Sequence, residues 1–276
     1  MQITHVGPAL LPAFEAYSRR YGPEHDDSWL PEPGFVADDD NPSYVALDAG
    51  GAVAGAASLM LTPAYRAAGK GRFRIFHVAD GSPATYRRLL AALLPHAAGV
   101  QSIYLFVPQS RTATREALVE IGFAVERYSW MLRRPPASAS PPEFPTGFVL
   151  RPLRDGDVDA YCDLVNDAFA TAEGHIDLLP AGVRRMLNER WHIQEGMLLL
   201  WETTAAGEYA VGTVRMVRQT EPGQEGDEPT AYVEGLAVRP AYQGRGLGRA
   251  LLRAGLQVAE RLGLPVVLLS VAASNA

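Results

Sequence analysis

The sequence has little cysteine and no segment typical of a secreted or membrane-spanning protein. Only Cys162 is a cysteine among 276 residues, so a framework of internal disulfides is excluded. No cysteine and histidine spacing resembles a zinc site, and no apolar run approaches the roughly 18 residues of a spanning helix. The start, residues 1–5, lacks the basic and then apolar pattern of a signal peptide. We therefore expect a cytoplasmic protein with no metal and no membrane partner.

An excess of positive charge is missing as well. The chain has 25 lysines and arginines against 31 aspartates and glutamates, which gives a formal net charge of −6. A protein of this charge has no global field that attracts nucleic acid, and we expect no nucleic-acid partner. The acidity mildly favours a cationic amine substrate over an anionic one.

The chain also lacks the loops of common nucleotide-binding and hydrolase folds. A dinucleotide fingerprint needs glycine at its first, third and sixth positions, whereas Gly244, Gly246 and Gly248 occupy the first, third and fifth. A Walker A loop needs Gly-Lys-Ser/Thr, and the single Gly-Lys pair, residues 69–70, is followed by Gly71. No serine lies in a Gly-x-Ser-x-Gly elbow, so a hydrolase has no support.

What the sequence does contain is a glycine-rich turn between a strand and a helix. Residues 232–238 are predicted as a buried strand, 248–262 as a helix with apolar spacing, and 264–271 as a second buried strand. The glycines let the backbone approach an anion, and the N–H groups and dipole of the helix start favour negative charge. The turn predicts a pyrophosphate site, the alternative being an ordinary tight turn.

Positive side chains flank this turn, and its motif resembles that of a known family. Arg239, Arg245 and Arg249 add charge close to the glycines. Gln-x-x-Gly-x-Gly after a strand ending in Val-x-Pro resembles the acyl-CoA loop of the GCN5-related N-acetyltransferase (GNAT) superfamily. The resemblance implies acetyl-CoA as co-substrate, held by Leu236, Ala237, Val238, Gln243, Gly244, Arg245, Gly246, Leu247, Gly248, Arg249 and Asn275.

The sequence indicates two copies of one plan. Residues 135–145, rich in proline and serine, form the natural linker between domains at 1–134 and 146–276. Gly55 pairs with Gly212 at an offset of 212 − 55 = 157, and Val107 pairs with Val271 at 271 − 107 = 164. We predict α/β tandem GNAT-like domains, with mixed, mostly antiparallel twisted sheets flanked by helices. This tandem layout is distantly similar to the mycothiol synthase subfamily.

The first copy is predicted to be complete but catalytically silent. Strands are expected at 43–48, 52–61 and 71–79, a helix from Pro83, and a closing strand at 128–133. In place of the glycine loop stand residues 79–85, where Asp80 would repel a pyrophosphate and Pro83 lacks an N–H. The position where the family often has a tyrosine acid holds Leu118.

The second copy carries the loop but stops soon after the strand at 264–271. In the family, an asparagine like Asn275 begins a helix that carries the tyrosine, and two further strands close the sheet. Their absence predicts a truncated chain, an additional tail, or closure of the sheet by a neighbouring segment or chain. The sequence leaves these alternatives open.

Acetyl transfer needs an oxyanion donor and a way to deprotonate the amine. An amine with a pKa of about 10.4 is some 3.4 units into its unreactive form at pH 7, a cost of roughly 4.6 kcal/mol. By resemblance, the N–H of Ala237 or Val238 is the candidate oxyanion donor. Glu234 is the candidate base because alternation places it on one face with Leu236 and Tyr232. A solvent-facing glutamate is the alternative for Glu234, and a packing residue for Tyr232.

Other side chains carry weaker signals. Residues 171–177 occupy the family's acceptor-binding region and suit a cation, although solvated loop charge is the favoured explanation. Cys162 is predicted as a packed thiol and His192 as a surface or cap residue.

We predict acetyl-CoA-dependent N-acetylation of a small-molecule or peptide amine by a monomer or homodimer. The alternative is a non-catalytic acyl-CoA-binding regulatory protein.

Overall fold

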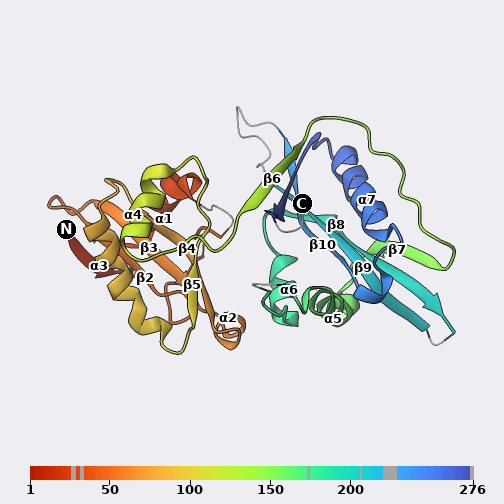
Figure 1. The fold of residues 1–276 in the computed structure, drawn as a ribbon, viewed down its shortest axis with the longest axis horizontal. Coiled ribbons are helices and arrows are strands. Elements are labelled where there is room, and N and C mark those ends of the chain that lie inside the picture. Colours follow the sequence, from red (N-terminus) through yellow and green to blue (C-terminus); the bar gives the residue numbers. More distant parts are fainter. Residues whose placement is uncertain (26–28, 32–33, 173–174, 206, 220–228, 274–276) are drawn as a thin grey trace. The chain divides into compact units, whose positions relative to one another are not determined.

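The computed structural model describes residues 1–276 except 26–28, 32–33, 173–174, 206, 220–228 and 274–276. The chain divides into two compact units, Met1–Glu126 and Arg127–Ala276, each built around one β-sheet with helices on both faces (Figure 1). The predicted fold class of two α/β units with mixed sheets is thereby confirmed. No helix in the described part of the chain is long and apolar enough to cross a membrane.

The first unit contains a five-stranded sheet of order β1-β2-β3-β4-β5, antiparallel except for the parallel pair of β4 and β5. Its strands are β1 (Gln2–His5), β2 (Ser43–Leu47), β3 (Val53–Met60), β4 (Lys70–Val78) and β5 (Ser102–Tyr104). Its helices are α1 (Leu11–Tyr21), α2 (Pro63–Ala67), α3 (Pro83–Leu93) and α4 (Thr112–Glu120), with short turns η1 (Gly22–Glu24) and η2 (Leu94–Ala97).

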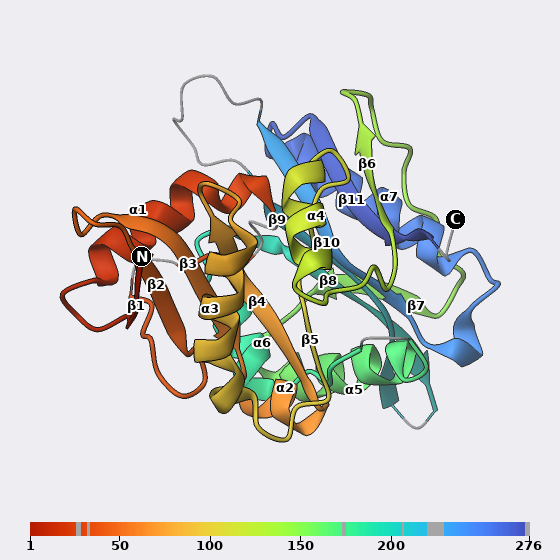
Figure 2. The ribbon, with the colours of Figure 1, turned by 60° about the vertical axis from the view of Figure 1, so that its left-hand side comes forward.

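Alternation along the strands gives this sheet two buried faces. Ala56 and Ile75 pack in one cluster with Phe14 of α1, whereas their chain neighbours Ala57 and Phe76 pack in another with side chains of α3 and α4. Figure 2 shows α3 in front of the strands of this sheet. Both faces are therefore covered, and the strands are apolar on both sides.

The second unit contains a six-stranded sheet of order β6-β11-β10-β9-β8-β7, in which β10 and β11 are parallel and the other pairs antiparallel. Its strands are β6 (Ser129–Arg134), β7 (Phe148–Pro152), β8 (His192–Thr204), β9 (Gly207–Arg218), β10 (Thr230–Val238) and β11 (Val266–Ala272). Its helices are α5 (Val158–Phe169), α6 (Pro180–Met186) and α7 (Leu247–Arg261), with turns η3 (Asp155–Asp157) and η4 (Pro240–Tyr242).

Helix α7 covers one face of this sheet, and α5 and α6 cover the other (Figure 1). The helix turns its apolar stripe of Leu247, Leu251, Ala254 and Val258 toward the strands. The opposite face packs Tyr161 and Leu164 of α5 against apolar side chains of β8. The candidate functional residues described below are divided between these two faces of the sheet.

The internal repeat extends to the strand register. Gly55 lies opposite Val78 in the first sheet, and Gly212 lies opposite Val238 in the second. A Cβ at Gly212 would lie 2.8 Å from Cδ1 of Leu251, and one at Gly55 would lie 3.2 Å from the His77 carbonyl oxygen. Each glycine therefore stands where the sheet leaves little room for a side chain.

Strand β6 belongs to the second sheet rather than the first, which differs from the predicted domain limits. Residues 129–134 pair with β11 along the whole stretch from Ser129↔Ala272 to Arg134↔Val267. The predicted closing strand of the first domain thus extends the second sheet at β11. The sequence pattern of this strand does not specify which sheet it joins. Pairing with β6 gives hydrogen-bond partners to the backbone groups of β11, which would otherwise form an open sheet edge.

The proline-rich segment is attached to α7. The Ala139 N–H donates to Oε2 of Glu260 at 3.1 Å, and Phe144 packs against the core beneath α7. The segment therefore forms part of the surface of the second unit instead of a solvated tether.

Candidate active site

The glycine loop forms a short bridge between β10 and α7. Gly244 and Gly246 have φ angles of +73° and +80°, and no atom lies within 4 Å of where a Cβ on either would stand. Gly246 is the N-cap of α7, whose first N–H groups have no partner within the helix. Leu247 is buried and anchors the helix start, whereas Arg245 and Arg249 are exposed. This is an open, cationic helix N-terminus suited to an anion.

Gln243 and Gly248 connect this loop to the strand before it. The Gln243 side chain donates from Nε2 to the carbonyl oxygen of Val238 at 3.0 Å. A Cβ on Gly248 would lie 3.9 Å from Cγ2 of Val238. The loop is therefore held over the end of β10.

Arg239 does not face the loop, contrary to the expectation that it adds charge there. Its side chain is buried, donates from Nε to the Ala210 carbonyl oxygen at 2.8 Å, and donates from Nη1 to Asp167 at 2.9 Å. The guanidinium also lies over the Tyr209 ring. Its charge is matched inside the unit, so Arg245 and Arg249 remain as the arginines beside the anion site.

The corresponding turn in the first unit is occupied by its own side chains. The Ser82 hydroxyl accepts from the Thr85 N–H at the start of α3, and Asp80 accepts from the Ser82 N–H at 3.0 Å. Pro83 follows at the first helical position, where it offers no N–H. An acidic and capped helix start of this kind disfavours an anion.

β10 separates from β11 before it reaches the loop. Within the described residues, the parallel register of the two strands runs from Thr230↔Val266 to Val233↔Leu269 and stops there. Arg239 donates its N–H to the Val211 carbonyl oxygen on β9, and backbone groups alternate in direction along a strand. The backbone of Ala237 therefore faces β9, and the N–H groups of Leu236 and Val238 face the side from which β11 has separated.

Glu234 lies on a β-bulge of β10. Val233 is opposite Met216 and Gly235 is opposite Arg215, so Glu234 is the extra residue. Because of the bulge, Leu236 packs in the core under α7, whereas Glu234 contacts Arg215 on the α5 and α6 face. The expectation that Glu234 shares a face with Leu236 is wrong, because simple alternation does not hold across a bulge. Tyr232, opposite Val217, remains on the same face as Glu234.

An arginine joins Glu234 to a second carboxylate. Arg215, whose side chain is 2% exposed, contacts Glu234 through Nη1 and donates from Nη2 to Oε2 of Glu189 at 2.8 Å. The Glu234 side chain itself is 33% exposed. Desolvation raises the pKa of Glu234; the Arg215 guanidinium opposes that rise and Glu189 adds to it.

Two further groups near this ion cluster were not singled out as site residues from the sequence. Burial raises the pKa of Tyr161, which stays protonated beside Arg215 and Glu234. Burial also lowers the pKa of His192, followed by the effect of Arg215, so this histidine favours its neutral form. His192 is half-buried rather than a surface residue. The signal in the sequence was Arg215, a charge within the apolar run of β9.

Comparison with known proteins agrees with this geometry. The profile of the Acetyltransferase (GNAT) family matches residues 160–276. The chain is 30% identical over 267 residues to a mycothiol acetyltransferase of Pseudarthrobacter chlorophenolicus, which covers 93% of this chain and 76% of that protein. It is also 30% identical to one of Acidothermus cellulolyticus, over 87% of this chain and 71% of the relative. The chain belongs to the GNAT family.

Other relatives match over a smaller part of their length. A mycothiol acetyltransferase of Salinispora arenicola is 34% identical over 57% of this chain, and the match spans half of that protein. Among solved GNAT structures, a tandem GNAT protein from the clavulanic acid biosynthesis pathway superposes with a TM-score of 0.63 at 14% identity, covering 100% of this chain and 91% of that one. A GNAT protein of Sphaerobacter thermophilus gives 0.61 at 19% identity, over 99% and 86%. These structures show the same tandem fold.

Several residues considered in the sequence of this GNAT chain lie outside the described part or have a packing role. Asn275 lies outside the described residues, as do Glu173 and Gly174 of the predicted acceptor segment. Cys162 is a buried thiol whose pKa desolvation raises, which fits a packing role. No group of three or more potential metal ligands occurs in the portion that the structure describes.

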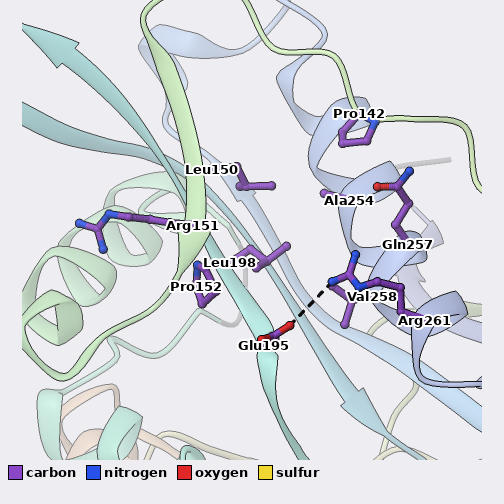
Figure 3. Close-up of a pocket in the computed structure, with 10 residues that line it drawn as sticks. All are labelled: Pro142, Leu150, Arg151, Pro152, Glu195, Leu198, Ala254, Gln257, Val258 and Arg261. Carbon is purple, nitrogen blue, oxygen red and sulfur yellow. Dashed lines mark ion pairs between the residues drawn. The ribbon is translucent and has the colours of Figure 1, made fainter.

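A cavity of about 290 Å³ lies on the α7 face of the second sheet, opposite to the face that carries Glu234. It is lined by residues of α7 and of strands β7 and β8. Leu198, Ala254 and Val258 form its apolar wall, and Arg261 pairs with Glu195 at 4.0 Å (Figure 3). Neither Glu234 nor the glycine loop contributes to its lining. The cavity is therefore distinct from the candidate active site.

Proposed function

We propose that the second unit is an N-acetyltransferase that moves an acetyl group from acetyl-CoA to a primary amine of a small molecule or peptide. The observation that carries this proposal is the separation of β10 from β11 beyond Val233, directly before a glycine loop at the start of α7. The gap exposes strand backbone to a thioester arm, and the loop offers N–H groups to its pyrophosphate. The open end of β10 and the glycine loop are contiguous in the sequence, within residues 236–249.

Acetyl-CoA binding involves the loop and the end of β10. The N–H groups of Gly244 to Arg249 receive the pyrophosphate, with the positive end of α7 and the guanidinium groups of Arg245 and Arg249 adding attraction. The backbone of Leu236 and Val238 receives the pantetheine arm and thioester. Ala237 contributes by packing, since its backbone faces β9.

The N–H of Val238 or Leu236 is the oxyanion donor in this proposal. Each faces the open side of β10, and a fixed donor aimed at the developing oxyanion stabilises the tetrahedral intermediate. The Gln243 side chain holds the Val238 peptide through its carbonyl oxygen, which fixes the orientation of the strand end. Of the two donors left open by the sequence, the proposal therefore keeps Val238 and leaves out Ala237.

Glu234 serves as the general base. It takes a proton from the acceptor ammonium, directly or through a water, and so frees the nitrogen lone pair to attack the thioester carbon and form the tetrahedral intermediate. Collapse of the intermediate breaks the C–S bond and releases the CoA thiolate, which is protonated as the nitrogen loses its remaining extra proton. A raised pKa suits this role because the best base titrates close to the working pH. Tyr232, on the same face, contacts the acceptor or returns a proton to the thiolate.

The acceptor is proposed to be a small cationic molecule. The carboxylates of Glu189 and Glu234 on this face favour an ammonium group, and the net charge of −6 acts in the same sense. The shared name of the relatives, mycothiol acetyltransferase, supports a small molecule over a peptide. The first unit, with its capped and acidic helix start, is proposed to bind no acetyl-CoA.

The test is calorimetric titration of acetyl-CoA into the chain, followed by thiol release with a panel of small amines. We expect one site per chain and release that depends on the amine. Binding without release would favour the regulatory alternative, and absence of binding would overturn the cofactor assignment. Two sites per chain would overturn the assignment of a silent first unit.

Substitution tests the base separately from the binding site. Glu234→Gln should lower kcat/KM by about 10² or more and leave acetyl-CoA affinity unchanged. Glu208→Gln on the neighbouring strand removes an exposed carboxylate away from the bulge and should have no effect. Unchanged acetylation by Glu234→Gln would remove the base assignment while leaving the acetyltransferase assignment intact.

A further inference from the structure

We propose that Arg215 is a positioning residue that fixes the Glu234 carboxylate at the acceptor side of β10, and that Glu189 fixes Arg215 in turn. This inference rests on the proposed function, in which Glu234 is the base. It concerns residues that touch neither the acetyl group nor the loop and act through Glu234.

The first step is the anchoring of the guanidinium. Arg215 lies on β9 directly opposite Gly235, next to the bulge. Its Nη2 donates to Glu189 at 2.8 Å and to the Met186 carbonyl oxygen at 3.3 Å, both beyond the strands at the end of α6. A planar fork held at two points presents its remaining N–H groups in one direction. Nη1 therefore meets Glu234 from a fixed position.

The second step is the freedom of Glu234 without this partner. A bulge residue has no cross-strand neighbour of its own, so nothing in the ladder selects its rotamer. Gly235 adds no side chain, and a Cβ there would approach only Arg215 at 3.8 Å and the Tyr161 hydroxyl at 3.9 Å. The Glu234 side chain is one-third exposed, so it would otherwise sample solvent. The ion pair with Arg215 limits that motion.

The third step is the charge balance around the carboxylate. Glu234 interacts with Arg215 from β9, with Glu189 from the turn before β8 and with Tyr161 from α5. His192 of β8 interacts with Arg215 and Glu189 of the same cluster. Desolvation raises the pKa of Glu234, Arg215 lowers it and Glu189 raises it. Loss of Arg215 and loss of Glu189 must therefore move the titration of Glu234 in opposite directions. A merely structural role for either residue predicts no such pair of shifts.

The experiment compares pH profiles of kcat/KM for the amine that responds best, in the full chain. Arg215→Gln should lower kcat by about 10²-fold through misplacement of the base and move the acidic limb up by about one pH unit. Glu189→Gln should move that limb down, with a smaller loss of kcat. Arg215→Lys, which keeps the charge but loses the fork, should restore the position of the limb and only part of kcat.

A matched control separates positioning from folding. Arg151 also lies on a strand and pairs with a carboxylate, Asp157, but contacts neither Glu234 nor the loop. Arg151→Gln should leave the acidic limb in place. Thermal melts and acetyl-CoA affinity report folding for every variant, and Glu189→Gln keeps the proposal testable if Arg215→Gln fails to fold.

The failures of the two proposals are distinguishable. An unchanged rate for Glu234→Gln overturns the base assignment itself. A large loss for Glu234→Gln, together with acidic limbs that stay in place for folded Arg215→Gln and Glu189→Gln, overturns the positioning role alone.

Discussion

The Arg239 guanidinium donates from Nη1 to Oδ2 of Asp167 at 2.9 Å, which ties the end of β10 to α5. The same side chain donates from Nε to the Ala210 carbonyl oxygen on β9. An arginine one residue beyond the last paired residue of β10, Val238, and five before Gly244 is thus directed inward. It fixes the strand end from which the loop departs, and its contribution to the site is structural.

Arg239→Met should therefore reduce stability more than cofactor affinity. Removal of hydrogen bonds made by a buried cation costs about 1–3 kcal/mol, while the partly exposed Asp167 regains water. We expect urea unfolding to shift accordingly and acetyl-CoA affinity to change less than threefold. Arg249→Met, at an exposed site beside the loop, should do the reverse. A folded Arg239→Met protein that binds acetyl-CoA more weakly than Arg249→Met would contradict this assignment.

The two ends of α7 provide a matched pair of glycines. Gly246 at its start and Gly263 beyond its end have φ angles of +80° and +66°, with no atom within 4 Å of either added Cβ. Alanine at either position should destabilise the unit by about 1–2 kcal/mol through the left-handed backbone. Only Gly246→Ala should weaken acetyl-CoA binding, and Gly246→Asp should abolish it, as measured by calorimetry. Equal loss of affinity at both ends would show that helix strain, not the loop, is responsible.

The loop, the strand before it and the helix after it were predictable because their signals are local. Glycine spacing and apolar periodicity both follow from residues that are close in the sequence. The bulge at Glu234 was not predictable, since it depends on how many residues of β9 oppose those of β10. The same holds for Glu189, which meets Arg215 only after the turn behind α6 folds back onto β9.

The partner of β6 was also beyond the sequence. Its residues have the pattern of an edge strand, which does not specify a sheet, and the proline-rich segment after it gives no sign of attachment to α7. Only the register with β11 and the packing of Phe144 place both in the second unit.

This attachment predicts a measurable role for the segment. Phe144→Ala removes part of an aromatic side chain that packs against the core beneath α7, and should lower the stability of the second unit by about 1–2 kcal/mol. Its neighbour Glu143 is exposed, and Glu143→Ala should have no effect. Limited proteolysis of the segment should quicken only in the first variant. A wild-type segment cut as fast as that of Phe144→Ala would indicate that it does not dock on α7.

A buried histidine in the first unit should make stability depend on pH. The Tyr17 hydroxyl donates to the Ala54 carbonyl oxygen at 3.1 Å, so the Nδ1 of His77, 2.9 Å away, must carry the proton that joins them. Nε2 faces Glu24 at 3.7 Å. Desolvation lowers the pKa of His77, an effect that Glu24 opposes.

The direction of the effect follows from the lowered pKa. The unfolded chain binds a proton at His77 near pH ~6.5, before the folded chain does, so stability is complete above that pH and falls as pH decreases toward the folded pKa. His77→Asn keeps a donor for Tyr17 but does not titrate, and should reduce the slope of unfolding free energy as the pH falls below about 6.5. Urea unfolding of both proteins across this range measures the difference. Parallel slopes would mean that the dependence arises elsewhere, for instance at His192, whose pKa burial also lowers in the second unit.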